Sequence, residues 1–188
     1  MNHLFMDRGV NILRFSAVYG ANASGKSNLV KAMQFGQEWI LGEWRLNSKE
    51  AYCKIREDNR NKPSTFEYDI KIGDKYYSYG FSTVLSKKQI REEWLFEMGV
   101  EDNEESILLF SREYNPESET YTTTFDEKCF SSDTRTVLDV YAEGVNTTSN
   151  HLFLTSMNLK KAGICNKYPE LEILFKVNDW FHSTLSIV

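Results

Sequence analysis

Hydrophobic and polar residues alternate through the middle of the chain. Every second residue from Phe66 to Ile72 is hydrophobic, which is the pattern of a strand with one buried face. Gly73-Asp74 then supplies a two-residue turn, and a strand-like return run follows at 75–84, so this region predicts a β-hairpin. The centre of the chain is therefore expected to be an antiparallel meander with one packed face and one solvent-exposed face. Its further strands are predicted at 89–97, 106–112 and 119–125.

The two ends of the chain have a different pattern. Residues 11–19 form an apolar run that predicts a strand, and 27–40 has hydrophobic residues at helical spacing. From Asp133 onward the pattern is helical again, and Pro169 is expected in the first turn of a helix. The apolar stripe of that helix contains Leu171, Leu174, Phe175 and Phe181.

This order of elements predicts an α/β fold with α+β character. We expect a single lobe over 1–188, divided into a strand–loop–helix unit, an antiparallel β subdomain and a mainly helical return to the core. These three parts are expected at 1–58, 63–130 and 133–188, with flexible linkers at 59–63 and 143–150.

Composition narrows the class of protein. The 188 residues are 41% hydrophobic and 26% charged, which is typical of one globular domain. The net charge of −5 gives no support to a nucleic-acid surface, and no apolar run reaches the ~20 residues of a membrane span. The cysteines and histidines are dispersed without metal-ligand spacing, so we expect reduced thiols in a cytoplasmic protein without membrane contact. These residues are Cys53, Cys129, Cys165, His3, His151 and His182.

One short segment carries specific chemistry. Residues 20–27 (GANASGKS) match the phosphate-loop pattern G-x-x-x-x-G-K-[ST] at every fixed position. Gly20 and Gly25 allow the backbone N–H groups to turn toward the phosphates, and the following helix points its N-terminus at the same anion. Lys26 is expected on the β- and γ-phosphates, and the Ser27 hydroxyl on Mg²⁺. The predicted ligands are therefore ATP and Mg²⁺, bound by Gly20, Ala21, Asn22, Ala23, Ser24, Gly25, Lys26, Ser27 and Asn28, with Ser27 as the metal ligand.

The segment from Ala17 to Met33 (AVYGANASGKSNLVKAM) resembles the bacterial ABC-like AAA family ATPases, which are related to overcoming-lysogenization-defect nucleases and SMC-type ATPases. Residues 63–82 and 90–96 are similar to the antiparallel insertion of that group, and 151–158 and 178–188 to the segments that close its first lobe. The resemblance covers most of the chain and implies a P-loop NTPase first lobe. It also implies ATP hydrolysis coupled to an effector, with a homodimer or an effector complex as the assembly and phage defence or DNA maintenance as the setting.

Two motifs of that group are not found in the sequence. The apolar run Ile107–Phe110 ends in Ser111 instead of an Asp-Glu pair, and Val140 follows Asp139 where a second acid should stand. A Ser/Gly-rich signature segment is missing too, and the catalytic residues stay unknown. We expect the first lobe of a larger ATPase. Two alternatives remain, a nucleotide-dependent regulatory module that does not hydrolyse ATP and a small-molecule kinase built on the same loop.

Several polar and aromatic residues admit a second interpretation. Gln89, or a polar residue within 156–158, could sense Mg²⁺, although a solvated position accounts for each more simply. Glu92 and Glu93 are expected at a solvated strand end, and Ile90, Trp94 and Phe96 on one face of their strand. Aromatic residues could stack nucleic-acid bases, but a sheet core is the expected role of Tyr76, Tyr77, Tyr79 and Trp94.

Overall fold

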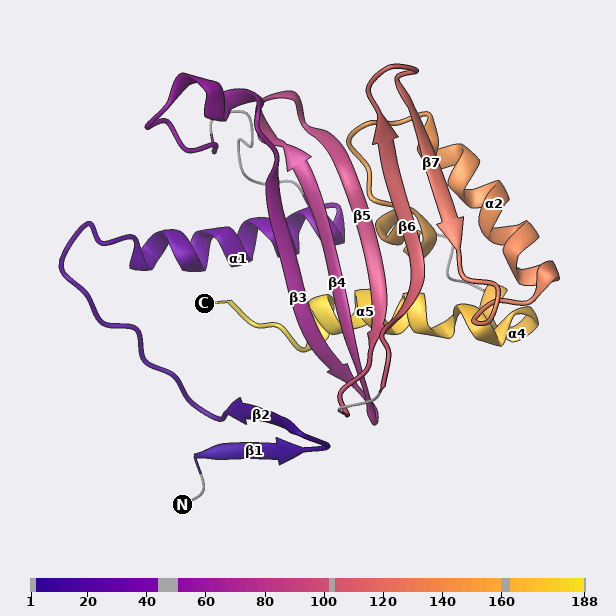
Figure 1. Ribbon diagram of the computed structural model, residues 1–188, viewed down its shortest axis with the longest axis horizontal. Coiled ribbons are helices and arrows are strands. Elements are labelled where there is room, and N and C mark those ends of the chain that lie inside the picture. The colour runs from indigo at the N-terminus through magenta and orange to yellow at the C-terminus, as the bar shows by residue number, and fades with distance from the viewer. Residues whose placement is uncertain (1–2, 44–50, 102–103, 160–162, 188) are drawn as a thin grey trace.

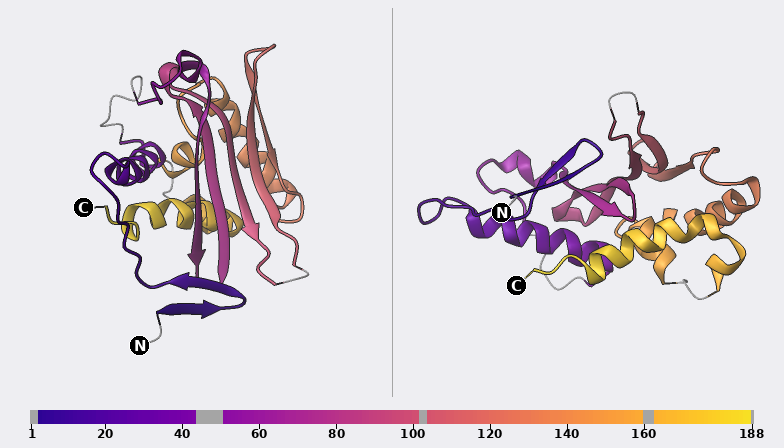
Figure 2. Two further views of the ribbon diagram at one scale, coloured as in Figure 1. Left: turned by 60° about the vertical axis from the view of Figure 1, so that its left-hand side comes forward. Right: turned by 90° about the horizontal axis from the view of Figure 1, so that it is seen from below.

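The computed structural model describes residues 3–43, 51–101, 104–159 and 163–187. A five-stranded antiparallel sheet forms the centre, with its strands in chain order, β3-β4-β5-β6-β7. The helices lie across one face of this sheet, as Figures 1 and 2 show from three directions. The strands are β3 (Ser64–Ile72), β4 (Lys75–Val84), β5 (Gln89–Met98), β6 (Ile107–Asn115) and β7 (Thr120–Phe125).

All five predicted strands of the meander are confirmed. The hairpin pairs Ile72 with Lys75, so Gly73 and Asp74 form its two-residue turn, and Gly73 has a φ of 61° that favours glycine. From Ser64 to Ile70 of β3, half-buried or buried residues alternate with exposed ones, as a sheet with one packed face requires.

The face assignment within β5 is wrong. A register shift lies where β5 meets Ser82 and Thr83 of β4, and it leaves Arg91 as an extra residue between two paired positions. Ile90 therefore points to the helices, but Trp94 and Phe96 lie on the opposite face. The bulge inserts one residue into a period of two, so residues on either side of it change face.

Helices cover the packed face. They are α1 (Lys26–Leu41), α2 (Ser132–Asn146), α3 (Phe153–Asn158), α4 (Ile164–Lys167) and α5 (Glu172–Ser183), with 3-10 turns η2 (Glu57–Asn61), η3 (Leu85–Lys87) and η4 (Pro169–Leu171). The helix predicted at 27–40 is confirmed as α1, and Pro169 begins η4 immediately before α5. The predicted stripe on α5 and η4 is buried at Leu171, Leu174, Phe175 and Phe181.

Aromatic side chains join the helices to the sheet. Phe66 of β3 stacks between Phe35 of α1 and Phe81 of β4, with ring centres 5.3 and 5.1 Å apart. The edge of Phe181, from α5, meets the rings of Tyr68 and Tyr79 at 5.0 and 5.9 Å. Such edge-to-face pairs add about 0.5–1.5 kcal/mol each beyond the burial of apolar area. The second half of α1 is thereby held firmly on the sheet.

The predicted flexible linkers are wrong in part. Residues 59–61 belong to η2, and 143–146 form the last turn of α2. That turn is held because Ala142 and Val145 are buried in the core. Apolar burial at helical spacing therefore extends the helix further than the polar appearance of the segment suggested.

The strand predicted at 11–19 is also wrong over most of its length. The N-terminal segment forms a separate hairpin, β1 (Leu4–Asp7) with β2 (Val10–Leu13), and residues 15–20 belong to no strand. A strand needs a neighbour to accept its backbone hydrogen bonds, and the described residues place none beside 15–20. Figure 1 shows this segment as an extended arm that leads from β2 to α1.

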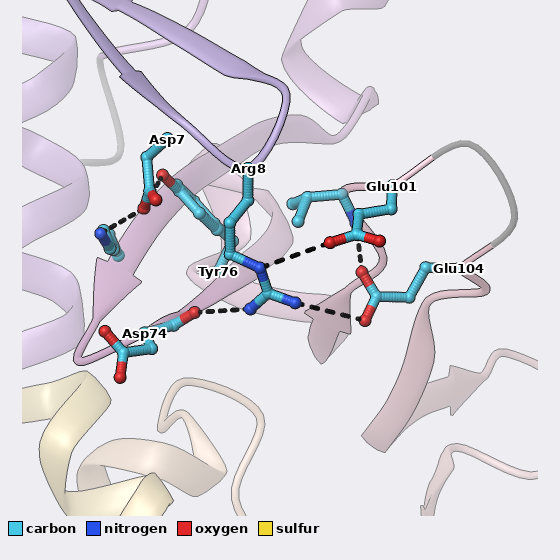
Figure 3. Close-up of polar contacts among 8 residues, drawn as sticks. Asp7, Arg8, Asp74, Tyr76, Glu101 and Glu104 are labelled. Carbon is cyan, nitrogen blue, oxygen red and sulfur yellow. Dashed lines mark hydrogen bonds and ion pairs between the residues drawn. The ribbon is translucent and has the colours of Figure 1, made fainter.

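Polar contacts hold the N-terminal hairpin on the sheet (Figure 3). Asp7 accepts hydrogen bonds from Lys71 and from the hydroxyl of Tyr76, the second at 3.0 Å. The guanidinium of Arg8 donates to the carbonyl of Asp74 at 3.0 Å and lies near two carboxylates, Glu101 at 3.7 Å and Glu104 at 3.8 Å. Lys71 and Tyr76 lower the pKa of Asp7 by hydrogen bonding, which favours the charged carboxylate.

Candidate nucleotide-binding site

The loop at 20–27 lies between the arm and α1. Ala23 and Gly25 both have positive φ, 65° and 93°, and these turn the chain sharply just before the helix begins at Lys26. The turn is closed by the Ser24 N–H, which donates to the Ala21 carbonyl at 3.2 Å. Alternating left- and right-handed conformations in successive residues direct backbone N–H groups into one concavity, which is an anion-binding geometry.

The N-terminus of α1 adds further donors. Its N-cap is Gly25, and no side chain accepts a hydrogen bond from the first-turn N–H groups. The first turn also contains no acidic residue. The helix therefore presents uncapped donors and the positive end of its dipole to the loop, both of which favour a phosphate.

Lys26 folds back over the loop. Its Nζ donates to the carbonyls of Gly20 at 2.6 Å and Ala21 at 2.7 Å, and to the Oγ of Ser24 at 3.3 Å. The ammonium group thus lies inside the loop, where a phosphate would need its counter-charge. A β-carbon added at Gly20 would lie 2.6 Å from the Oγ of Ser24, so a larger residue there would displace the Ser24 side chain.

The loop is fully accessible. Residues 20–25 and Ser27 are exposed, and Lys26 is half-buried. Hydrophobic side chains on both sides of the loop are exposed as well: Phe15 at 79%, Val18 at 62% and Tyr19 at 90% on the arm, and Leu29 at 54% on α1. A group of exposed apolar side chains near a site commonly marks interaction with another protein surface.

The possible Mg²⁺ sensors are not brought to the loop by any contact among the described residues. Gln89 is the first residue of β5, and its carbonyl accepts a hydrogen bond from Thr83. Ser156 and Asn158 lie on α3, and their side chains donate back to the carbonyls of Leu152 and Leu154. The side chains of Ser156 and Asn158 are therefore used within their own helix.

The expectation for Glu93 is wrong. This residue is only 1% exposed, whereas its neighbour Glu92 is exposed as expected. The Glu93 carboxylate accepts hydrogen bonds from the N–H groups of Phe153 at 2.6 Å and Leu154 at 3.0 Å, at the start of α3. It also accepts a hydrogen bond from the hydroxyl of Tyr79 at 2.9 Å. Glu93 points toward the helices because the bulge at Arg91 changes the face on which the residues after it lie. Its hydrogen bonds therefore join the sheet to α3.

A buried arginine lies directly opposite Glu93. Arg112 of β6 is the register partner of Glu93 and is 0% exposed. Its guanidinium donates to the side chain of Asn146 and to three backbone carbonyls, all at 3.0–3.1 Å, and lies 3.8 Å from the ring centre of Tyr121. The carbonyls belong to Val145, Thr148 and His151, so Arg112 holds the end of α2 and the segment that leads to α3.

Burial shifts the pKa values of both residues. Loss of solvent raises the pKa of Glu93, while the charge of Arg112 and the hydrogen bonds from Leu154 and Phe153 lower it by less. Loss of solvent likewise lowers the pKa of Arg112. The pair could not be expected from sequence because charged residues normally lie outside. Arg112 lies two residues after the apolar Phe110 and therefore on the same face of the strand, and this spacing was the sequence signal that Arg112 points inward.

Tyr77 and Tyr79 are buried in the core, which confirms their predicted role. Tyr76 is buried on the opposite face of the sheet, where its hydroxyl donates to Asp7, and Trp94 is half-buried on that same face. All three cysteines are free thiols, and the described part of the chain contains no group of residues arranged to hold a metal ion. Within the same residues, no helix is both long and apolar enough to cross a membrane.

The architecture and the loop together define a mixed α/β domain with the phosphate-loop sequence at the start of a helix. A family model described as "AAA domain, putative AbiEii toxin, Type IV TA system" matches residues 15–123, which is more than half of the chain. The chain belongs to this family of P-loop ATPase domains, which confirms the resemblance to ABC-like AAA ATPases. No curated protein and no solved structure matches the chain. The family indicates nucleotide binding, and its domains generally use ATP and Mg²⁺.

Proposed function

We propose that the chain binds Mg-ATP at Gly20–Ser27. The ammonium group of Lys26 moves from the carbonyls of Gly20 and Ala21 to the β- and γ-phosphates. The backbone N–H groups of Asn22–Ser27 surround the phosphates, and the hydroxyl of Ser27 binds Mg²⁺. The single observation that carries this proposal is the position of the Lys26 ammonium, 2.6 and 2.7 Å from two loop carbonyls beside an uncapped helix N-terminus.

The proposed role of nucleotide binding is to control contact with a second protein surface, either another copy of the chain or an effector. The exposed apolar residues on the arm and on the first half of α1 support this, because they lie on both sides of the loop. A surface that covers them would also reach the bound nucleotide. Phage defence or DNA maintenance is the proposed setting, in keeping with the family description.

Replacing Lys26 by alanine should weaken ATP binding by about 100-fold or more. A hydrogen bond to a charged group contributes about 1.5–3 kcal/mol, and the substitution removes such bonds to two phosphates. Titration of a fluorescent ATP analogue in the presence of Mg²⁺ measures the affinity. Lys31→Ala is the matched control, because Lys31 is an exposed lysine further along the same helix. Its affinity should stay within about twofold of the wild type, and equal affinities of the Lys26 variant and the wild type would reject the assignment.

Two other functions use the same loop. A regulatory module would bind ATP without turnover, and the missing Asp-Glu pair favours it for this chain. A small-molecule kinase would transfer phosphate to an acceptor, although such kinases usually place helical lids where this chain has antiparallel strands. Phosphate release measured with and without a candidate acceptor separates the three functions.

A further inference from the structure

The sheet face that carries no helix is strongly acidic. Figure 1 looks onto this face. Four exposed carboxylates lie on it: Glu67 and Asp69 on β3, Glu92 on β5, and Glu113 on β6. Within the described ranges of the chain, none of the four forms an ion pair. The face therefore has an excess of negative charge, with Arg91 as a cationic residue that lines a hollow together with Glu92 and Glu113.

Two of these carboxylates are placed unfavourably for stability. Glu92 and Glu113 are direct cross-strand partners. Like charges in that position are destabilising, because the two β-carbons of such a pair are about 4.5–5.5 Å apart. A cation placed between them would turn this repulsion into attraction.

Aromatic and aliphatic side chains fill the centre of the same face. The ring of Trp94 occupies the space above Gly80, where an added β-carbon would lie 2.5 Å from the ring. The Trp94 Nε1 donates to the carboxylate of Glu67 at 3.2 Å. Phe96 and Leu108 continue the apolar strip. Together with Glu92 and Glu113 they line a hollow of about 230 Å³. An aromatic ring flanked by carboxylates can bind a lysine or arginine side chain by charge and by cation–π attraction.

We propose that this acidic face, defined by Glu67, Asp69, Glu92, Trp94 and Glu113, docks a lysine- or arginine-rich segment of a partner protein. Charge complementarity determines the occupant, because the same carboxylates would repel the phosphates of a nucleic acid. The proposal goes beyond nucleotide binding. The acidic face lies on the sheet and shares no residue with the phosphate loop.

The test measures binding of a rhodamine-labelled octa-arginine peptide by fluorescence anisotropy at low and at physiological salt. The double variant Glu92→Gln/Glu113→Gln removes two charges from the acidic face and should weaken binding by about tenfold. The matched control Asp139→Asn/Glu143→Gln removes two exposed charges from α2, whose buried residues pack in the core on the other side of the sheet. It should change the affinity by no more than about twofold.

Further measurements distinguish docking at the acidic face from unspecific attraction and from metal binding. The Glu92→Gln/Glu113→Gln variant should melt no lower than the wild type, because it removes a like-charge pair. Lys26→Ala should bind the peptide as the wild type does, whether or not the phosphate loop binds ATP. Equal weakening by the face variant and the α2 control would overturn the proposal in favour of unspecific attraction to an acidic protein. Displacement of the peptide by millimolar Ca²⁺ in the wild type alone would overturn it in favour of a metal site.

Discussion

Replacement of Arg112 by methionine will lower the free energy of unfolding by about 3–5 kcal/mol, because a buried carboxyl loses the neighbouring positive charge and several acceptors lose their donor. The substitution leaves the Glu93 carboxyl, in a site that is 1% exposed, without the neighbouring positive charge. It also leaves the side chain of Asn146 and three backbone carbonyls without the donor that now lies 3.0–3.1 Å away. Both losses act at the point where the sheet meets α2 and α3, so no local adjustment restores them.

Urea unfolding followed by circular dichroism measures this change. The control is Arg91→Met on the adjacent strand. Arg91 is half-buried, and its guanidinium lies 4.7 Å from the ring centre of Tyr114. Loss of that cation–π contact should cost no more than about 1 kcal/mol. The double variant Glu93→Gln/Arg112→Met should recover part of the stability because it leaves no unpaired charge. Equal stabilities of Arg112→Met and Arg91→Met would show that the buried pair has no special role.

The difference in the free energy of unfolding between the wild type and Arg112→Met should be larger at about pH 8 than at about pH 5. Burial raises the pKa of Glu93 above its ordinary value, and the charge of Arg112 opposes this rise. Without Arg112 the pKa of Glu93 in the folded protein rises further. A carboxyl whose folded pKa exceeds its unfolded value contributes stability at low pH that is lost as the pH rises through the folded pKa. Urea unfolding of both proteins at the two pH values tests this. A deficit that grows on acidification would contradict it.

The sheet could be predicted because short stretches of sequence are enough to specify its strands. Alternation from Phe66 to Ile72 and a Gly-Asp turn specify both the strands and their pairing. The faces of β5 could not be predicted in the same way. The bulge at Arg91 arises from pairing with β4, and this pairing is not visible within the strand itself. Glu93 was consequently assigned to solvent and Trp94 to the packed face, and the structure reverses both.

The N-terminal region shows a second limit of local reasoning. Residues 11–19 have the composition of a buried strand, and Val18 and Tyr19 are nevertheless exposed. An apolar composition indicates that a segment could form a buried strand. A strand forms only where a neighbouring strand supplies partners for its backbone hydrogen bonds. The phosphate loop differs from this segment, because the groups expected to bind a phosphate all lie within eight consecutive residues and the first turn of α1. The loop could therefore be found from sequence, and a catalytic carboxylate could not be assigned.

The purified chain should bind ATP and yet release phosphate more slowly than about 0.01 per second, compared with about 1–100 per second for efficient phosphoryl-transfer enzymes. Binding needs donors for the phosphates and a ligand for Mg²⁺, and Gly20–Ser27 contains both types of group. Hydrolysis also needs a carboxylate that orients water and added positive charge or dipoles at the γ-phosphate in the transition state. The sequence contains neither an apolar run ending in Asp-Glu nor a Ser/Gly-rich signature segment. The loss of each such contribution commonly slows turnover by about 100-fold or more.

The measurement is phosphate release at saturating Mg-ATP, with Lys26→Ala purified in parallel to reveal contaminating ATPases. Release per chain should be equally low in the two preparations and should not rise as the protein concentration is increased. A rate that rises with concentration in the wild type alone would mean that a second copy supplies the missing groups at the loop. Turnover near ~1 per second that is constant with concentration and vanishes in Lys26→Ala would mean that a carboxylate within this chain reaches the nucleotide.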